Sequence, residues 1–188
     1  REAKYWKDRT DFWKTQGIKS KIDMKLEHNI NDLKDSISKG RIKTKPVNTS
    51  DPVLMDTLFN WFMNKKGKIL DLCADTAIPG LVAGSLGLEY IGYNPINEII
   101  KNNKKEVKTS SANLKITPKW IKENVCNITS NSDFDFVMCR PPLWTLEHLH
   151  DKENNPVTTY DSYKTSMEEI LNKGIDSLKD GRFFALIT

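Results

Sequence analysis

Side chains able to bind or position a ligand follow four strands that the sequence predicts. The four segments are residues 74–80, 94–97, 123–127 and 140–144. Because the carboxyl ends of parallel strands meet at one edge of a sheet, we expect these segments to lie together. Arg140 supplies a permanently charged guanidinium with five N–H donors, and Asp75 supplies a negative charge. The sequence therefore predicts a polar ligand site at this edge.

Spacing argues against two common kinds of site. A dinucleotide fingerprint needs three glycines in segment 74–80, where only Gly80 is present, so NAD binding is not expected. His148 and His150 have no neighbouring cluster of ligands, so no metal site is expected. The three cysteines, Cys73, Cys126 and Cys139, form no Cys-x-x-Cys pair. They are expected to be buried thiols in strands, and neither disulfides nor zinc ligands.

Alternating strands and helices must position these segments. Short continuous apolar runs are typical of buried parallel strands, and apolar residues three or four apart are typical of helices. Strands are expected over residues 68–73, 88–93, 120–121, 134–139 and 182–187, with helices over 78–86, from 95 onward and over 162–178. This order predicts an α/β fold with a doubly wound, Rossmann-like sheet. One face of the last helix is expected to pack through Tyr163, Met167, Ile170, Leu171, Gly174, Ile175 and Leu178.

The N-terminal residues differ in composition from the rest. Residues 1–45 are expected to form a Lys-rich helical appendage, and residues 46–188 the α/β domain. The appendage is predicted to contain a short helix and a second helix over 21–37. Trp6 and Trp13 would pack the appendage onto the domain or stack on nucleic acid, and both interpretations stay open.

A helix is predicted where the domain begins. Ser50 or Asp51 can cap it, with Pro52 in its first turn. Its apolar residues lie on most sides, Trp61 among them, so this helix is expected to be buried.

Basic charge is concentrated at the N-terminal end. The sequence holds 29 Lys and Arg against 25 Asp and Glu, and residues 1–50 hold 13 basic and 7 acidic side chains. An electrostatic attraction to DNA is therefore expected at this end, with a solvated lysine-rich surface as the alternative. Because only five residues are Arg, the chain has few side chains suited to bidentate recognition of bases.

The composition is that of a single globular domain. With 188 residues, of which 38% are hydrophobic, the chain can build one core. No window approaches the roughly 18 to 20 consecutive apolar residues of a membrane span, so we expect no membrane partner and a cytoplasmic or phage-associated location. The sequence starts without Met and stops inside a predicted strand. A fragment is therefore expected, with an exposed sheet edge near Ile187 that a protein partner could cover.

Four segments, read in order, resemble the DNA amino-methyltransferases, which modify the exocyclic amine of adenine or cytosine. They are Asp51-Pro-Val-Leu, Lys68-Ile-Leu-Asp-Leu-Cys-Ala, Leu86-Gly-Leu-Glu-Tyr-Ile-Gly and Val137-Met-Cys-Arg-Pro-Pro-Leu-Trp. The chain is most similar to the phage and prokaryotic kind, from about Trp6 to Thr188. The resemblance implies a seven-stranded sheet, about five strands of which are visible, with S-adenosylmethionine as cofactor and DNA as partner.

Several cofactor-binding positions depart from the family. The positions that correspond are Asp71, Ala74, Asp75, Ala77, Asn94 and Asn124. Asp75 and Ala77 stand where the family has glycines that let the backbone approach the cofactor, and Asp75 adds a charge beside the methionyl carboxylate. Asn94 and Asn124 replace carboxylates that the family uses for the ribose hydroxyls and the adenine amine. These changes predict weakened cofactor binding.

The family's catalytic tetrapeptide corresponds to Arg140, Pro141, Pro142 and Leu143. In the family its first side chain, from Asp, Asn or Ser, accepts protons from the target amine. Arg140 has no acceptor and would bring a cation near the cofactor's sulfonium. Leu143 removes the aromatic face on which a flipped base stacks. The tetrapeptide is therefore expected to be non-functional, with Arg140 contacting a DNA phosphate instead.

Three functions are compatible with these residues. The first is a DNA amino-methyltransferase-like protein that is catalytically inactive and acts as a DNA-binding or scaffolding subunit. The second is an active S-adenosylmethionine-dependent DNA methyltransferase of adenine or cytosine exocyclic amines, with an unusual site. The third is a purely structural component of a larger assembly, bound through the exposed sheet edge.

Overall fold

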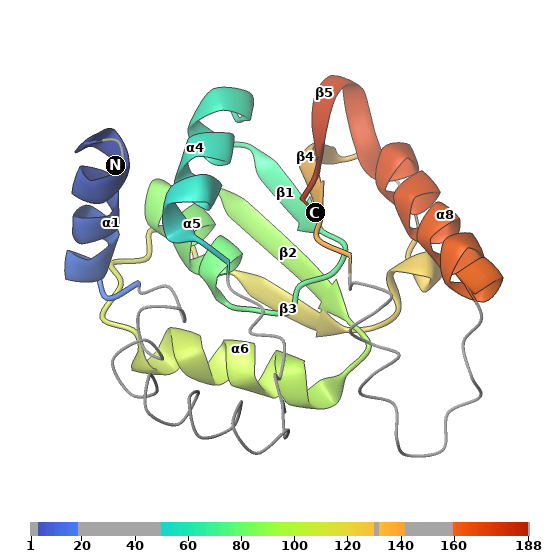
Figure 1. The fold of residues 1–188 in the computed structure, drawn as a ribbon, viewed down its shortest axis with the longest axis horizontal. Coiled ribbons are helices and arrows are strands. Elements are labelled where there is room, and N and C mark those ends of the chain that lie inside the picture. The colour runs from blue at the N-terminus through green and yellow to red at the C-terminus, as the bar shows by residue number, and fades with distance from the viewer. Residues whose placement is uncertain (1–3, 19–49, 130–131, 142–159, 188) are drawn as a thin grey trace, which may run out of the picture.

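One parallel sheet of five strands organises the chain. The computed structural model describes residues 4–18, 50–129, 132–141 and 160–187. The strands are β1 (Lys68–Asp71), β2 (Glu89–Asn94), β3 (Lys119–Lys122), β4 (Phe134–Cys139) and β5 (Leu178–Leu186). They pair in the order β3-β2-β1-β4-β5, and every pairing is parallel (Figure 1). The expected doubly wound α/β sheet is confirmed, and its strand order reverses between β1 and β4.

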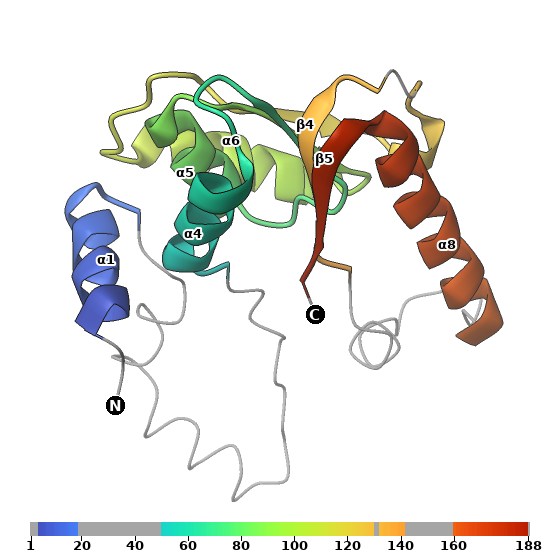
Figure 2. The same ribbon diagram turned by 90° about the horizontal axis from the view of Figure 1, so that it is seen from above.

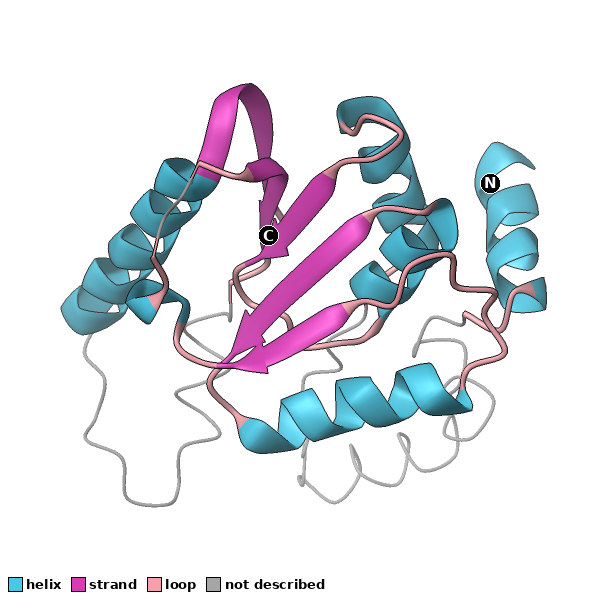
Figure 3. Ribbon diagram, turned by 180° about the vertical axis from the view of Figure 1, so that it is seen from behind, coloured by secondary structure: helices cyan, strands magenta, loops and turns pink. Residues whose placement is uncertain are grey.

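Helices cover both faces of this sheet. They are α1 (Lys4–Thr15), α4 (Pro52–Phe62), α5 (Ile78–Leu86), α6 (Asn97–Thr109) and α8 (Tyr160–Ser177), with a 3-10 turn, η1, at Val125–Asn127. One apolar cluster joins α1, α4, α5 and α6 to the sheet, and a second joins α8 and η1 to it. Figure 2 shows α8 across β5 from α4, and Figure 3 shows the sheet from behind. No helix in the described part of the chain is both long and apolar enough to cross a membrane.

The central elements lie close to their predicted positions. β4 spans the expected residues 134–139, and α5 ends as expected at Gly87, whose φ of +82° is the left-handed conformation that glycine adopts readily. Asp51, not Ser50, caps α4, because its carboxylate accepts a hydrogen bond from the Val53 N–H at 2.7 Å. The Ser50 hydroxyl lies instead 2.9 Å from the Thr76 hydroxyl, a contact that joins the segment before α4 to the loop after β1.

Three predictions at the margins of the fold are wrong. β5 begins at Leu178, four residues earlier than expected, and pairs with β4 through an irregular register. The side chain of Trp61, near the end of α4, is 74% exposed. Ile175 is 59% exposed, because α8 approaches the sheet through Gly174, where an added Cβ would lie 2.6 Å from Phe184. The predicted helix over 21–37 lies outside the described residues.

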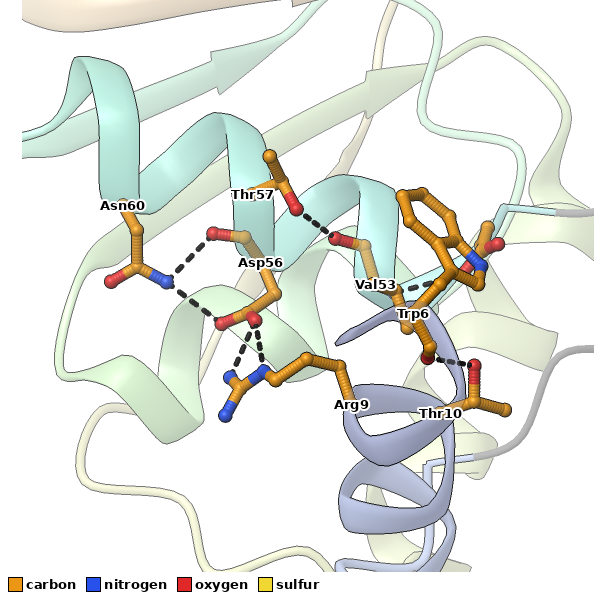
Figure 4. A network of polar contacts seen from close by, with 8 residues as sticks. Trp6, Arg9, Thr10, Val53, Asp56, Thr57 and Asn60 are labelled. Atoms are coloured by element: carbon orange, nitrogen blue, oxygen red, sulfur yellow. Dashed lines mark hydrogen bonds and ion pairs between the residues drawn. The ribbon is translucent and has the colours of Figure 1, made fainter. Parts of the chain in front are cut away.

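The N-terminal helix α1 shares the core of the sheet domain. Trp13 and Ile18 are each 1% exposed and belong to the same cluster as Phe59 of α4. Arg9 of α1 donates through Nε to Oδ2 of Asp56 at 2.8 Å, and its Nη2 contacts the same oxygen (Figure 4). For Trp13, packing onto the domain is therefore confirmed over stacking on nucleic acid.

Candidate functional site

The carboxyl ends of β1, β2 and β4 meet, as the sequence predicts. The Ala74 N–H donates to the Tyr93 carbonyl at 3.0 Å, which joins the loop after β1 to β2. The Leu72 N–H donates to the Met138 carbonyl at 3.0 Å, which joins the start of that loop to β4. The loop after β1 is therefore the centre of the site, with β2 and β4 on its two sides.

An ion pair between Asp75 and Arg140 joins the loop after β1 to the end of β4. Nη2 of Arg140 donates to Oδ1 of Asp75. The side chains of Arg140 and Asp75 are only 18% and 15% exposed, so their attraction is screened less than that of a surface pair. Each charge therefore offsets the other, which reduces the repulsions expected of Asp75 against a carboxylate and of Arg140 against a sulfonium.

This pairing also bears on the phosphate contact expected of Arg140. The guanidinium is partly buried and directed to Asp75, so a phosphate would have to compete with a carboxylate that already lies in place. Arg140 is consequently a poorer phosphate ligand than its position after a strand suggests.

Asp71 is the last residue of β1 and is close enough to Asp75 and Arg140 for both charges to affect its pKa. Tyr90 of β2 donates its hydroxyl to Oδ2 of Asp71 at 2.7 Å, and the Cys73 N–H donates to Oδ1 at 3.1 Å. The pKa of Asp71 is raised from 3.8 to about 6: burial is the main cause and nearby Asp75 adds to it, whereas the Tyr90 hydrogen bond opposes it. Burial and the adjacent Asp71 also raise the pKa of the Tyr90 hydroxyl well above its usual value.

Tyr90 and Asn103 are site residues that the sequence analysis missed. Nδ2 of Asn103, on α6, donates to the Ala74 carbonyl at 3.3 Å, and both residues are buried. The Tyr90 hydroxyl lies close to Gly92: a Cβ added to Gly92 would be 2.9 Å from the hydroxyl oxygen. Glycine within a strand often marks such a close approach, so Gly92 was the available signal.

The positions where glycine was expected do not need glycine here. Among the described residues, Ser132 is the only non-glycine residue with a positive φ, so Asp75 and Ala77 both lie in ordinary backbone regions. Ala77 has φ −77° and ψ −17° and precedes α5, and Ala74 and Ala77 are fully buried. The loop after β1 therefore folds without strain. It carries side chains at the two positions where the DNA amino-methyltransferases have glycines that leave space for the cofactor.

The two asparagines are used locally. Oδ1 of Asn94 accepts from the Ile96 N–H at 2.9 Å, and Asn94 is 8% exposed. Oδ1 of Asn124 accepts from the Cys126 N–H at 3.0 Å and so caps η1, on an exposed part of the surface. In both cases the amide oxygen expected to bind the cofactor already accepts one backbone N–H, so only its second lone pair is left for a ligand.

The remaining predicted positions are only partly visible. Pro141 follows Arg140 and is half-buried, whereas Pro142 and Leu143 lie outside the described residues. Sγ of Cys73 lies 3.8 Å from Sγ of Cys139. Of the cysteines expected to be buried, Cys139 is buried, and the other two are partly exposed. The described part of the chain contains no group of His, Cys, Asp or Glu arranged to hold a metal ion.

Comparison with solved structures decides the fold. An S-adenosylmethionine-dependent methyltransferase from Methanosarcina mazei matches 69% of this chain and 55% of its own length, with a TM-score of 0.52 and 18% identity. The chain has the S-adenosylmethionine-dependent methyltransferase fold. A Bacillus halodurans protein described as a methyltransferase matches 72% of this chain and 49% of its own, with a TM-score of 0.50 and 10% identity. A Bordetella parapertussis protein described as exported matches 72% and 40%, with a TM-score of 0.50 and 7% identity.

These likenesses show the methyltransferase fold alone. The chain spans about half the length of the structures that it matches. No family model matches the sequence, and no curated protein matches it. The DNA amino-methyltransferase subtype stays a prediction.

The residues at the expected cofactor site of this methyltransferase fold do not fit S-adenosylmethionine in the family's manner. The Asp75 side chain and its bond to Arg140 lie where the family's glycine leaves the loop open. The Asn94 oxygen, at the position of the ribose-binding carboxylate, is held by the Ile96 N–H. An adenosyl ligand would therefore have to compete with the Asp75–Arg140 pair and share the Asn94 oxygen with the Ile96 N–H.

Proposed function

We propose that this chain is a methyltransferase-fold domain that does not transfer methyl groups and acts as a DNA-binding or scaffolding subunit. The observation that carries the proposal is the bond from Arg140 to Asp75. Methylation of an exocyclic amine needs an acceptor for the amine protons at the end of β4. Arg140 presents only donors there, and Asp75, the nearby acceptor, is engaged by Arg140 itself.

A specific surface favours the scaffolding part of this proposal. Trp61, Phe183 and Leu186 are 74%, 47% and 52% exposed, and Phe183 belongs to the edge strand β5. The ring of Phe62 lies 4.8 Å from that of Phe183 and 6.3 Å from that of Trp61, which makes these rings neighbours. Exposed aromatic side chains on neighbouring elements, Trp61 on α4 and Phe183 on β5, are typical of a surface that further polypeptide covers. A purely structural role in a larger assembly would use this same surface.

The test is methyl transfer from S-adenosylmethionine carrying a labelled methyl group to a panel of adenine- and cytosine-containing duplexes. We expect no transfer above the background of heat-denatured protein, for the chain and for Arg140→Ala alike. Transfer by the chain that disappears in Arg140→Ala would overturn the proposal and establish the active-enzyme alternative. A circular dichroism spectrum of each sample excludes loss of fold as the reason for silence.

A further inference from the structure

The exposed face of α6 carries four lysines in one stripe. Lys101, Lys104, Lys105 and Lys108 follow the i, i+3, i+4, i+7 spacing that places residues on one side of a helix. All four are exposed. The opposite side of α6 is fixed against the domain by Ile100, which is 3% exposed, and by the buried bond from Asn103 to Ala74. The packing of α6 therefore leaves the stripe exposed, and α6 itself lies beside β3 (Figure 1).

Other exposed helices of this protein arrange their charges differently. Lys4 of α1 lies 3.6 Å from Asp8, and Lys164 of α8 lies 3.9 Å from Glu168, each an i, i+4 pair of opposite sign. In α6 the i, i+4 neighbours within the stripe are both lysines, an arrangement that destabilises an isolated helix. The helix dipole accounts for Lys108, in the last turn, and Glu98, at the i, i+3 spacing, accounts for Lys101, but neither accounts for Lys104.

We infer that this lysine stripe binds the phosphate backbone of double-stranded DNA. Along the helix the stripe runs from Lys101 to Lys108, roughly 10 Å at 1.5 Å per residue, so it can contact several successive phosphates. Lysine ammonium groups recognise phosphate as point charges, without reading bases, so the binding is independent of sequence. The inference rests on the DNA-binding part of the proposed function and assigns it a surface.

The composition of the stripe favours duplex DNA over two other polyanions. Single strands are held by aromatic platforms on which bases stack, and the exposed face of α6 has no aromatic residue. Helices that lie on membranes insert a large apolar face, whereas the apolar residues of α6, such as Ile100 and Val107, are packed against the protein core. What remains exposed is a polar, basic surface.

The test measures binding of the full chain to a fluorescent duplex of about 25 base pairs by anisotropy, at several salt concentrations. Four phosphate contacts give a slope of about −3.6 in log K against log salt, so affinity falls about 100-fold between about 50 and 200 mM salt. The stripe variant carries Lys101→Gln, Lys104→Gln, Lys105→Gln and Lys108→Gln. The matched control removes the same charge elsewhere, with Lys4→Gln, Lys7→Gln, Lys65→Gln and Lys66→Gln. Glutamine has nearly the helix propensity of lysine, so both variants should fold.

We expect the magnitude of the slope to fall by about 3 in the stripe variant and by less than about 1 in the control. An unchanged slope in the stripe variant, or an equal loss in the control, would overturn the assignment to α6 while leaving DNA binding intact. The equal loss would show that binding is spread over the lysines of the surface and not confined to α6. No duplex binding by the wild-type chain at low salt would overturn both this inference and the DNA-binding part of the proposed function. Binding of the stripe to phosphatidylserine vesicles but not to duplex would likewise overturn it in favour of a membrane.

Discussion

Replacing Arg9 with alanine should lower the free energy of unfolding by about 3 to 5 kcal/mol, the usual cost of leaving a buried charge without its partner. Asp56, on α4, is 0% exposed, and its Oδ2 is held by Arg9 (Figure 4). Asn60 donates to the other carboxylate oxygen of Asp56, Oδ1, at 2.8 Å, but it carries no positive charge. The variant should therefore separate α1 from α4 or leave an uncompensated carboxylate in the core.

Thermal unfolding followed by circular dichroism measures this effect. At about 2 to 4 °C per kcal/mol for a chain of this size, Tm should fall by about 10 °C. Lys7→Ala is the matched control, because Lys7 is exposed on the same helix and its loss should cost less than about 0.5 kcal/mol. A change of similar size in both variants would show that α1 is not held by the Arg9–Asp56 pair.

Asp71 should make the protein less stable as pH rises from about 4 to 6. Its pKa in the folded protein is about 6, against 3.8 when unfolded, so the folded state favours the protonated carboxyl. The cost of the ionised, buried form is absent below pH 3.8 and complete above pH 6, where a shift of this size is worth about 3 kcal/mol.

Urea unfolding of the wild-type chain and Asp71→Asn across this pH range isolates the effect. Asparagine retains an oxygen for the Tyr90 hydroxyl but does not titrate, so the difference between the two proteins should change by about 3 kcal/mol in favour of the variant as pH rises. Comparison with the variant removes the contributions of groups such as Asp135, whose pKa is lowered by its bonds to Lys68 and Lys179 despite the opposing effect of burial. A difference that is constant with pH would show that folding does not raise the pKa of Asp71.

The sheet was predictable because its signals are local. The apolar run of β4 and the glycine after α5 mark their elements from neighbouring residues alone. The exposure of Ile175 was not predictable, because helical periodicity assigns a face but not the point at which the helix touches the sheet. That point is Gly174, where the absence of a side chain allows Phe184 and Leu72 to approach.

The residues of the site were predictable, but their contacts were not. The rule that strand ends meet placed Asp75 and Arg140 near each other, 65 positions apart in sequence. Each residue considered alone suggested a charge facing the ligand, whereas together they neutralise each other. Opposite charges after adjacent strands were the signal, and a pairwise comparison of the loops would have found it. The oxygen of Asn94 likewise accepts a hydrogen bond from a backbone turn that residue type alone does not show.

The most direct measurement is titration calorimetry of the full chain with S-adenosylmethionine. If the Asp75–Arg140 pair closes the cofactor site and Asn94 offers only a shared oxygen, no binding heat should appear up to about 1 mM ligand, which limits the affinity to about −4 kcal/mol. A dissociation constant in the micromolar range, about −8 kcal/mol, would contradict the closure of the site and with it the proposed loss of methyl transfer.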